Sequence, residues 1–446
     1  MSNPWPKILR DPVHNLIAFQ DNPWDRLILD LLNTREVQRL RRIKQLGFSE
    51  LVFPGANHSR FAHSLGVLHV TKKFLDQFDM VTGKQPDEHQ RRLILAAALL
   101  HDIGHGPFSH AFEKVTGIKH ERYTKEIIEN PDTQVNRVLR EADSKLPEDL
   151  ARLFAEEAED GNSSSPVPPY LTHVISSQFD ADRCDYLLRD SFATGTDYGR
   201  YDLEWLLSHV QPASDGRRFF LSRKALSAAE AYIFARFRMY RTVYFHKTTR
   251  AAEVMLKLLF KRCRELLGDS PSPEKAKELL PDAPRSVLAL FTGQPALECY
   301  IRIDEHSITE FLKACSECVD PLIKELGSGI VDRQLYKVID ATTLSSARVG
   351  EFTAAVQSHL SGDPSREYLF VNDSPADTPY KPYDPDAKKP AEQIFVEDGA
   401  GKLKEISILS KTIRDLRDEY ELARYYFPSR LRPDLEKIAK STLWKG

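Results

Sequence analysis

Residues 95–113 restrict the fold of this chain more than any other stretch. The segment opens with an apolar run at 95–100 and continues directly into His101 and Asp102. Apolar residues on nearly every side predict a helix buried among its neighbours, which would carry these two ionisable side chains into the interior. Successive helical residues lie about 100° apart, so an imidazole nitrogen and a carboxylate oxygen could both reach one metal ion between helices.

A break and a second helix are predicted immediately afterwards. Gly106 precedes Pro107 and is therefore disfavoured from helical conformation, whereas Pro107 suits the first turn of a new helix. In that helix His110 and Glu113 lie three positions apart on one face, a spacing at which a carboxylate can orient an imidazole. His105 lies at the break, so it is expected close to both helices.

The histidines of the chain are strongly clustered. A single His-Asp pair is usually structural, and taken alone it would rarely indicate a metal site. Of the fourteen histidines, however, eight fall between positions 58 and 120: His58, His63, His69, His89, His101, His105, His110 and His120. A structural requirement alone does not concentrate imidazole in this way, so the pattern favours a dedicated chemical site.

Two further metal ligands are expected from neighbouring helices. Ser59 can cap a helix that runs to about position 79 and carries His63 in an early turn. The helix expected over 174–190 supplies Asp182. Two imidazoles and two carboxylates accept iron, manganese, zinc, nickel or cobalt, and the ligand types alone do not choose among these divalent metals.

Composition and charge exclude several classes of protein. The formal net charge of −3 argues against polyanion binding over the whole surface, although 62 lysines and arginines allow local basic patches. No run approaches the roughly 20 apolar residues of a membrane span, and the first residues lack the layout of a signal peptide. We therefore expect a cytoplasmic protein without a membrane partner. The Cys315 and Cys318 pair favours buried thiols over a metal clip.

The remaining pattern predicts a mainly α protein with small β-hairpins and a C-terminal α/β lobe. Helices are expected over 24–33, 35–46, 59–79, 88–103, 174–190, 225–268, 272–282, 308–326, 348–361 and 411–425. Extended segments are expected as a hairpin over 7–19 and as strands over 217–222, 366–371, 393–396 and 404–409. Breaker-rich loops are expected over 158–169 and 375–390. The predicted division is an N-terminal hairpin and basic helix at 1–50, a helical core at 51–265 and a further lobe at 266–446.

The order of the four expected ligands resembles a known superfamily. Histidine, then His-Asp, then aspartate, here at 63, 101–102 and 182, is the pattern of the HD phosphohydrolases. Further segments resemble the deoxynucleotide triphosphohydrolase branch: Lys7-Ile-Leu-Arg-Asp-Pro, Gln38-Arg-Leu-Arg-Arg-Ile-Lys-Gln-Leu-Gly, Phe53-Pro-Gly-Ala, Arg60-Phe-Ala-His-Ser-Leu-Gly-Val, His101-Asp-Ile-Gly-His-Gly-Pro-Phe-Ser-His, His120-Glu and Asp182-Arg-Cys-Asp-Tyr-Leu-Leu-Arg-Asp. The resemblance covers roughly residues 7–250 and implies an HD-domain helical bundle.

That branch attacks the α-phosphorus of a dNTP and releases deoxynucleoside and inorganic triphosphate. The resemblance implies the same reaction here, with a transition metal at His63, His101, Asp102 and Asp182 and with Mg²⁺ on the triphosphate. It implies His110 as the general acid supported by Glu113, with His105 and His120 at the α-phosphate. Arg60, Arg183 and Arg236 match phosphate contacts, and the sugar pocket matches Gln45, Leu46, Tyr186, Asp190 and Tyr244. Without the family match, core packing would explain the two tyrosines equally well.

Relatives in this branch often assemble as tetramers when nucleotides bind near the N-terminal segment. The resemblance therefore implies a homo-oligomer, either a dimer or a tetramer, with a nucleotide activator bound near Lys7, Asn33, Gln38 and Arg41. Asn33 stands where the human-type enzyme has an acid that reads guanine. An amide presents one acceptor oxygen, so GTP or dGTP activation is disfavoured and another nucleotide or constitutive activity is favoured instead.

Two other functions compete with the triphosphohydrolase. HD sites also cleave phosphodiesters, and the basic stretch at 35–44 could guide single-stranded nucleic acid to the same centre. The alternative reading of that stretch is a solvated helix surface. A catalytically silent nucleotide-sensing protein is the third hypothesis. Reaction products separate the first two hypotheses. Cellular function and nucleotide binding retained in His101→Ala with Asp102→Ala would indicate the third.

Overall fold

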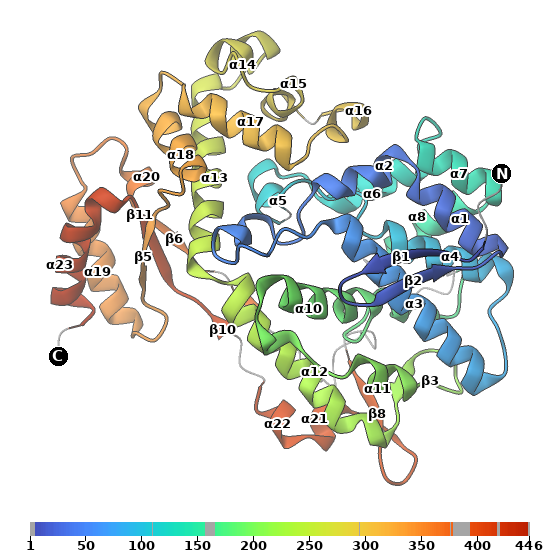
Figure 1. Cartoon of the computed structure of the whole chain (residues 1–446). Helices are drawn as coiled ribbons and strands as arrows, with labels where there is room; N and C mark the ends of the chain where they lie inside the picture. Colours follow the sequence, from blue (N-terminus) through green and yellow to red (C-terminus); the bar gives the residue numbers. More distant parts are fainter. Residues whose placement is uncertain are drawn as a thin grey trace.

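The computed structural model describes residues 5–108, 110–156, 166–293, 295–374, 376–377, 393–416 and 420–444. Side chains are described at these positions except 110, 156, 376–377 and 420–421. Most of these residues are helical, so the predicted mainly α fold with small β-hairpins is confirmed (Figure 1). Most of the two loops predicted over 158–169 and 375–390 lies outside the described residues.

The N-terminal and central parts of the chain are built from helices joined by short turns. The α-helices are α1 (Pro23–Leu32), α2 (Arg35–Arg39), α3 (Arg60–Thr82), α4 (Glu88–Leu100), α5 (His110–Thr116), α6 (His120–Glu129), α7 (Gln134–Ala142), α8 (Leu146–Glu156), α9 (Pro169–Ile175), α10 (Ala181–Thr194), α11 (Leu203–Ser208), α12 (Leu226–Met239) and α13 (Lys247–Leu267). Short helical turns are η1 (Leu40–Arg42), η2 (Gly47–Leu51), η3 (Asp197–Gly199), η4 (Arg223–Ala225) and the π-helix η5 (Tyr240–Tyr244).

The C-terminal part mixes helices with the remaining strands. Its helices are α14 (Pro273–Leu279), α15 (Arg285–Leu288), η6 (Ala289–Phe291), α16 (Leu297–Tyr300), α17 (Glu305–Ser316), α18 (Pro321–Val331), α19 (Ser346–His359), α20 (Arg366–Leu369), α21 (Ile406–Leu409), α22 (Lys411–Arg414), η8 (Ser429–Leu431) and α23 (Arg432–Thr442). None of the described helices is both long and apolar enough to cross a membrane.

The strands form small separate sheets. They are β1 (Lys7–Asp11), β2 (Asn15–Phe19), β3 (Val210–Pro212), β4 (Phe219–Leu221), β5 (Lys337–Asp340), β6 (Val371–Asp373), β7 (Ala376–Asp377), β8 (Phe395–Glu397), β9 (Leu403–Glu405), β10 (Tyr420–Glu421) and β11 (Arg424–Phe427). Strands β1 and β2 pair antiparallel with Lys7 opposite Phe19, and the other sheets have the orders β3-β4-β8-β9, β5-β11-β6 and β10-β7. In the β3-β4-β8-β9 sheet, β8 pairs with β4, so the segment 393–405 lies next to the central part of the chain.

Two helices that matter most for the site begin at side-chain caps. Ser59 accepts a hydrogen bond from the Ala62 backbone N–H and starts α3, as the sequence predicts. Asp87 and Gln90 form a capping box at the start of α4, whose residues from Leu93 to Leu100 are all buried. Helices α3 and α4 pack side by side, and α3 also packs against α10.

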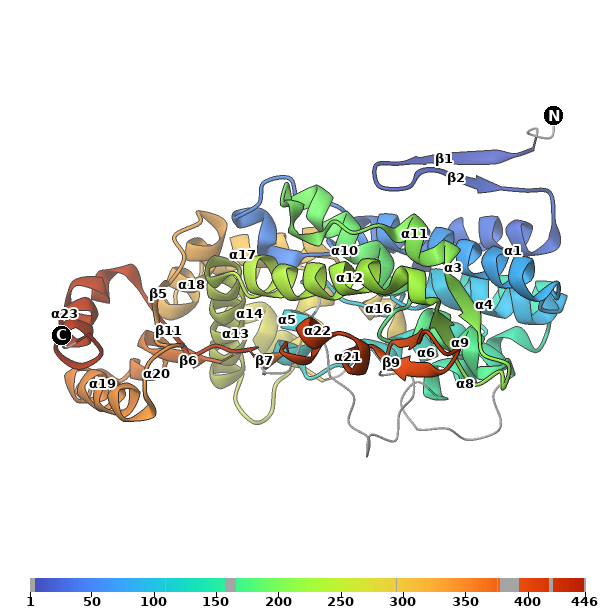
Figure 2. The same cartoon turned by 90° about the horizontal axis from the view of Figure 1, so that it is seen from below.

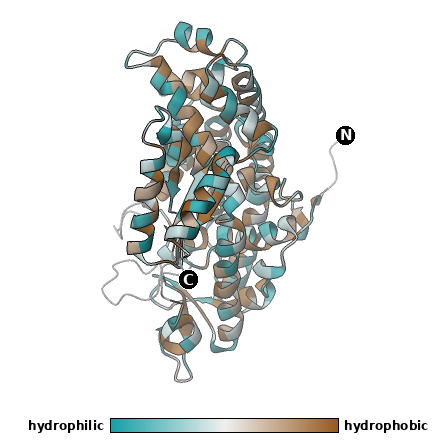
Figure 3. Ribbon diagram, turned by 90° about the vertical axis from the view of Figure 1, so that its left-hand side faces the viewer, coloured by the Kyte–Doolittle hydropathy of each residue, from teal (hydrophilic) through white to brown (hydrophobic). Residues whose placement is uncertain are grey.

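Apolar side chains form one large core and one small one. The large core runs from Ile17 through the central helices to α18, and Figure 3 shows helices that carry both hydrophobic and hydrophilic residues. The small core lies between α19, α23 and the β5-β11-β6 sheet, with Phe352, Val356 and Leu435 fully buried. The domain limits at 50 and 265 stay a prediction.

Several predicted elements differ from those observed. The helix predicted over 225–268 is interrupted by η5, and the one over 308–326 is two helices, α17 and α18. The helix predicted over 411–425 is wrong: α22 covers only its first turn, and β11 follows at Arg424. Segment 366–371 begins as α20 rather than as a strand. These errors fall in short segments, where helical and extended patterns are hard to distinguish.

The β1–β2 hairpin stands away from the helical body in Figure 2. Its strands expose Ile8, Leu9 and Leu16 by 51%, 38% and 40%, whereas Ile17 and Phe19 are buried in the large core. Asn15, the first residue of β2, follows the turn and adopts the left-handed conformation, with φ of 63°. The hairpin predicted over 7–19 is therefore confirmed, and Asp11 and His14 at its turn contact α10.

Candidate metal centre

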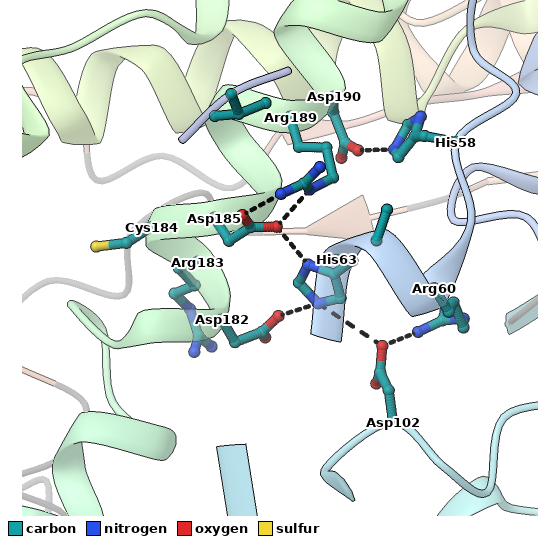
Figure 4. Close-up of polar contacts among 12 residues, drawn as sticks. His58, Arg60, His63, Asp102, Asp182, Arg183, Cys184, Asp185, Arg189 and Asp190 are labelled. Carbon is teal, nitrogen blue, oxygen red and sulfur yellow. Dashed lines mark hydrogen bonds and ion pairs between the residues drawn. The ribbon is translucent and has the colours of Figure 1, made fainter. Parts of the chain in front are cut away.

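Three helices bring four predicted ligands to one point. His63 comes from the first turns of α3, His101 caps the C-terminus of α4 with Asp102 following it, and Asp182 lies in the first turn of α10. Figure 4 shows His63, Asp102 and Asp182. The Nε2 atom of His63 lies 3.0 Å from Oδ1 of Asp182 and 3.7 Å from Oδ2 of Asp102. The Nε2 atom of His101 lies 3.5 Å from Oδ1 of Asp102 and 3.7 Å from Oδ1 of Asp182.

Hydrogen bonds orient both imidazoles toward this point. The Nδ1 atom of His63 is 2.8 Å from Oδ2 of Asp185, and Nδ1 of His101 is 2.9 Å from the carbonyl oxygen of Ala98. Because these oxygens can only accept, each Nδ1 carries a proton, and each Nε2 faces the carboxylates. Both Nε2 atoms are buried without a hydrogen-bond partner among the described residues. The site therefore directs two imidazole Nε2 atoms toward two carboxylates.

The electrostatics of this point favour a positive charge. Burial would lower the pKa of His63, but Asp182 and Asp185 raise it to about 10. Burial alone would raise the pKa of Asp102, yet Arg60 and the neighbouring imidazoles hold it well below its usual value. The pKa of Asp182 is also lowered: burial opposes this, but the attraction of the two neighbouring imidazoles prevails. Donor atoms of His63, His101 and Asp102 lie within 4.8 Å of one another, so the group could hold a metal ion.

The comparisons with known proteins identify the family. A model described as HD domain matches residues 60–190, and one described as HD associated region matches residues 202–277. The uncharacterized protein YwfO of Bacillus subtilis is 37% identical over 430 residues, which cover 95% of this chain and 93% of that protein. The chain belongs to the HD-domain family. HD domains bind divalent metals, which fits the two imidazoles and two carboxylates gathered here.

Two further relatives of this HD-domain chain carry descriptions of activity. The deoxynucleoside triphosphate triphosphohydrolase SAMHD1 homologue of Dictyostelium discoideum is 28% identical over 359 residues, or 77% of this chain and 62% of that protein. The crystal structure of a phosphohydrolase from Bacteroides thetaiotaomicron has a TM-score of 0.76 and 28% identity, covering 95% of this chain and all of that one. The chain is thus an HD-superfamily phosphohydrolase.

A pocket of about 680 Å³ opens beside Asp182 of this HD-domain protein. Its walls come from segments far apart in the sequence: η2, α10, η5 and the start of α13. Nine of the predicted site residues line it, namely Gln45, Leu46, Arg60, Glu113, Asp182, Arg183, Tyr186, Asp190 and Tyr244. Their individual roles stay predictions, but the fold brings them to one cavity.

Three predicted phosphate-binding arginines are held by nearby polar groups. Arg60 is bonded to Asp102, and Arg183 to the buried Asp180, which also accepts the Arg183 backbone N–H at the N-cap of α10. Arg236 donates to the side-chain oxygen of Gln178. Burial lowers the pKa of Arg183 and of Arg236, but nearby acidic and phenolic groups reverse this and raise it. The guanidinium groups of Arg183 and Arg236 therefore stay charged.

The predicted sugar-binding residues form a connected set. Asp190 accepts a hydrogen bond from the Tyr244 hydroxyl at 2.8 Å, and its other oxygen lies 2.7 Å from Nε2 of His58. The carbonyl oxygen of His58 accepts the backbone N–H of Gln45 at 3.0 Å. The rings of Tyr186 and Tyr244 meet edge to face, with centroids 6.1 Å apart. Tyr244 belongs to η5, and such π-helical turns are frequent at functional sites.

A close backbone approach brings α6 to the segment after His101. A Cβ atom at Gly104 would lie 2.2 Å from the His120 carbonyl oxygen and 2.4 Å from the Thr124 backbone nitrogen, so only glycine fits there. The Gly104 backbone N–H donates to the Thr124 hydroxyl. This packing places His120 next to His105, which itself lies 3.2 Å from Oδ1 of Asp102.

Predicted catalytic residues His105, Glu113 and His120 form a second cluster that could hold a metal by donor distance alone. The rings of His105 and His120 are stacked, however, with centroids 3.7 Å apart and an angle of 14° between them. A nitrogen lone pair lies in its ring plane, so nearly parallel rings cannot both point at one ion. Glu113 is hydrogen-bonded to Nδ1 of His120, whereas the side chain of His110, its predicted partner, lies outside the described residues.

The predicted regulatory residues lie on the surface around α1 and α2. Gln38 accepts a hydrogen bond of 2.8 Å from Nε of Arg41. Asn33 lines a separate surface pocket of about 860 Å³ between α1 and α7. The Lys7 ammonium lies 5.2 Å from the ring centroid of Trp5 on the hairpin. Their regulatory role stays a prediction.

Several positioning residues were missed by sequence reasoning. Asp185 binds His63, Asp180 binds Arg183, and His58 binds Asp190. Asp185 had a usable signal, because it lies three positions after Asp182 on α10 and therefore on the same side of the helix. Arg189 had the same signal, because it lies four positions after Asp185 on α10. His14 had none, since its contact with Asp185 joins segments that meet only in the fold.

Glu305 is a buried acid that ties α17 to the pocket. Its Oε1 atom accepts the backbone N–H groups of Lys44 at 2.9 Å and Phe108 at 3.2 Å, while Oε2 is buried without a hydrogen-bond partner among the described residues. Burial raises the pKa of Glu305 from 4.5 to about 7, against the opposing effect of these two N–H groups. The folded protein therefore holds this proton more tightly than the unfolded chain.

Replacement of Glu305 by glutamine is expected to remove a pH dependence of stability. The contribution of protonated Glu305 to the free energy of unfolding is fully present below pH 4.5. It is lost as pH rises through 7, because the buried carboxyl group then ionises inside the folded protein. Relative to wild type, Glu305→Gln should gain about 1–3 kcal/mol in free energy of unfolding between pH 5 and 8. Urea denaturation of both proteins at pH 5 and at pH 8 measures this difference in free energy of unfolding. Glu310→Gln, at an exposed position on the same helix, is the control, and parallel pH profiles for Glu305→Gln and wild type would contradict the assignment.

Proposed function

We propose that this protein is a metal-dependent dNTP triphosphohydrolase that converts a dNTP to deoxynucleoside and inorganic triphosphate. One observation carries the proposal: a single pocket of about 680 Å³ is lined by Asp182, by two arginines and by the set Gln45, Tyr186, Asp190 and Tyr244. The residues proposed to bind phosphate, metal and sugar would therefore all contact one nucleotide in this pocket. The description of the Dictyostelium relative as a deoxynucleoside triphosphate triphosphohydrolase supports the same substrate class.

The residues proposed for phosphate binding are prepared for an anion. Arg60 and Arg183 are both in the pocket wall and both fixed by carboxylates, Asp102 and Asp180, so little side-chain entropy is lost on binding. A divalent cation held by His63, His101, Asp102 and Asp182 would supply Lewis acidity and lower the pKa of a coordinated water. We assign iron, manganese, zinc, nickel or cobalt to this position, and Mg²⁺ to the triphosphate.

The proton and the sugar are assigned to the chain's own side chains. His105 and His120, stacked and oriented by Asp102 and Glu113, are proposed to hold the α-phosphate. His110 is proposed to protonate the leaving 5′-oxygen, which would otherwise depart as a poor alkoxide. The buried Oε1 atom of Gln45 lacks a hydrogen-bond partner among the described residues and could accept from the 3′-hydroxyl.

Discrimination against ribose is proposed to come from the tyrosine wall. Tyr186 and Tyr244 meet edge to face, and Tyr244 is fixed through its hydroxyl on Asp190. A wall held in this way cannot easily move aside for a 2′-hydroxyl. Binding that depends on both a hydrogen bond and a steric limit gives stronger selectivity than an apolar pocket alone.

The alternative function, cleavage of single-stranded nucleic acid, is less well supported. It was based on the basic stretch at 35–44, but Arg39 is buried, and Arg42 and Lys44 are paired with acidic side chains. Arg41 is exposed and packs over the Phe61 ring at 3.6 Å. The stretch therefore offers little free positive charge to a phosphate backbone.

The test is a product assay on the full chain. Each dNTP and NTP is incubated with protein and Mn²⁺ or Mg²⁺, with and without GTP, and products are separated by anion-exchange chromatography. We expect deoxynucleoside and triphosphate in equal amounts, with NTPs at least about 100-fold slower. Shortening of a labelled single-stranded oligonucleotide with inert dNTPs would favour the nuclease, and nucleotide binding without turnover would favour the silent sensor. Light scattering in the same buffers tests the proposed nucleotide-dependent dimer or tetramer.

A further inference from the structure

Asp185 joins the predicted metal ligand His63 to the turn of the β1–β2 hairpin. Its Oδ2 atom lies 2.8 Å from Nδ1 of His63 and accepts from Nε of Arg189 at 2.8 Å. Its Oδ1 atom lies 2.6 Å from Nε2 of His14 and accepts from Nη2 of Arg189 at 2.9 Å. Asp185 is fully buried and the His14 side chain is only 4% exposed. Figure 4 shows Asp185 between His63 and Arg189.

The hydrogen bonds of Asp185 are complete. A carboxylate has about four lone-pair positions, and three side chains fill all four of them. Each donor therefore limits how the carboxylate can turn. One of these bonds fixes the ring of His63. Loss of the bond from His14 or Arg189 would let the Asp185 carboxylate turn and would therefore change the position of that ring.

The hairpin turn supplies a second contact to the same network. Oδ2 of Asp11 accepts from Nη1 of Arg189 at 2.9 Å. Oδ1 of Asp11 accepts the backbone N–H groups of Val13 and His14, each at 2.9 Å, which fixes the turn. The turn thus holds the metal-facing network through both an imidazole and a carboxylate that lie more than 170 positions from Asp185 and Arg189 in the sequence.

The space between α3 and α10 leaves this network no alternative arrangement. A Cβ atom at Gly66 would lie 1.8 Å from Oδ1 of Asp185 and 2.5 Å from Nη2 of Arg189. The glycine lets the buried carboxylate and guanidinium pass directly over the α3 backbone. A displaced Asp185 has no room to re-form the bond to His63 in another position.

We propose that His14 is a positioning residue for the metal centre, acting through Asp185 on His63, so that the β1–β2 hairpin sets how tightly the centre retains its divalent cation. The proposal rests on the metal assignment made under the proposed function but not on the substrate. A hairpin that stands away from the body and contacts the network at its turn is suited to this role. Displacement of the hairpin would weaken cation binding without touching any metal ligand.

The test is cation affinity measured on the full chain without substrate. Metal-free protein is titrated with Mn²⁺, and free Mn²⁺ is followed by electron paramagnetic resonance; Zn²⁺ is measured by competition with a chromophoric chelator. We expect Asp185→Asn to weaken binding about 10–100-fold, as is typical for the partner of a metal-bound histidine. His14→Ala should weaken it about 3–10-fold, because the His63 bond remains but loses its support.

Two matched variants separate positioning from general damage. His14→Gln keeps an N–H donor near the Nε2 position and should restore affinity to within about twofold of wild type. His89→Ala removes an imidazole that bonds Asp143 and Asp149 at the far end of α4, and should leave affinity unchanged. Melting of the metal-free proteins is recorded, so that a loss of affinity at equal stability is attributed to the centre.

The outcomes separate this inference from the proposed function. Equal Mn²⁺ and Zn²⁺ affinities for wild type, His14→Ala and His14→Gln would overturn the inference while leaving a metal-dependent hydrolase intact. Weakened affinity in His14→Ala with rescue in His14→Gln supports it even if dNTPs prove not to be substrates. Failure of the wild-type chain to bind either cation would overturn both proposals.

Discussion

Replacement of His101 by alanine is expected to remove the bound cation and to lower phosphohydrolase activity by about 10³-fold. A catalytic metal contributes several kcal/mol of transition-state stabilisation, and each step of about 1.4 kcal/mol is a factor of ten in rate. His101 directs Nε2 to the centre because its Nδ1 donates to Ala98, and no other histidine could replace it without moving α4. Metal content per chain and the rate of triphosphate release measure the effect.

The control for His101→Ala must remove a histidine of the same helix without touching the centre. His89 meets this requirement, since it lies in the first turn of α4 and bonds Asp143 and Asp149. We expect His89→Ala to keep full metal content and activity, apart from a modest loss of stability. Full activity in metal-free His101→Ala would contradict the assignment of this site as the catalytic centre.

The sequence predicted that the four candidate metal ligands would lie together because each is on an element that local patterns define well. Ser59 caps α3 and sets His63 in its first turns, and the apolar run before His101 forces α4 into the interior. The spacing of His101 and Asp102 then leaves little freedom in where they point. Local propensity, burial pattern and the family resemblance all agree at these positions, and such agreement is what makes a prediction reliable.

Apart from Asp185, the support of these ligands could not be predicted, because it depends on contacts between distant segments. His14 reaches Asp185 only after the hairpin turn has packed against α10, and Gly66 is needed only because two helices cross closely there. The break at η5 depends on tertiary contacts that bring Tyr244 to Asp190. The error over 411–425 has a similar origin, since β11 extends there by pairing with β5 and β6.

The burial of Arg39 also depends on contacts between distant segments and could not be predicted from the sequence. A run of arginines on a short helix suggests a solvated or phosphate-binding face, yet the Arg39 side chain is fully buried. Its Nη1 donates to the His105 carbonyl oxygen at 2.8 Å, and its Nε and Nη2 donate to the Ile303 carbonyl oxygen. The guanidinium also lies 5.2 Å from the Tyr300 ring centroid. Burial lowers the pKa of Arg39, against the opposing effect of nearby acids.

Replacement of Arg39 by methionine is therefore expected to destabilise the protein by about 2–5 kcal/mol, because two buried carbonyl groups lose their donors. Arg39→Lys should recover only part of this loss, since an ammonium cannot span both carbonyls as the planar guanidinium does. Urea denaturation measures the free energy of unfolding. Activity should fall as well, because Arg39 holds the backbone at His105, which lies 3.2 Å from Asp102.

The control for Arg39→Met is Arg26→Met, on the neighbouring α1. The Arg26 side chain is 62% exposed and pairs with Asp21 on the surface, so its replacement should change stability by less than about 0.5 kcal/mol. Equal stabilities for the two variants would mean that Arg39 is solvated rather than buried. In that case the stretch 35–44 would regain the positive charge that the nuclease alternative requires, and oligonucleotide binding by wild type and Arg39→Met should then differ.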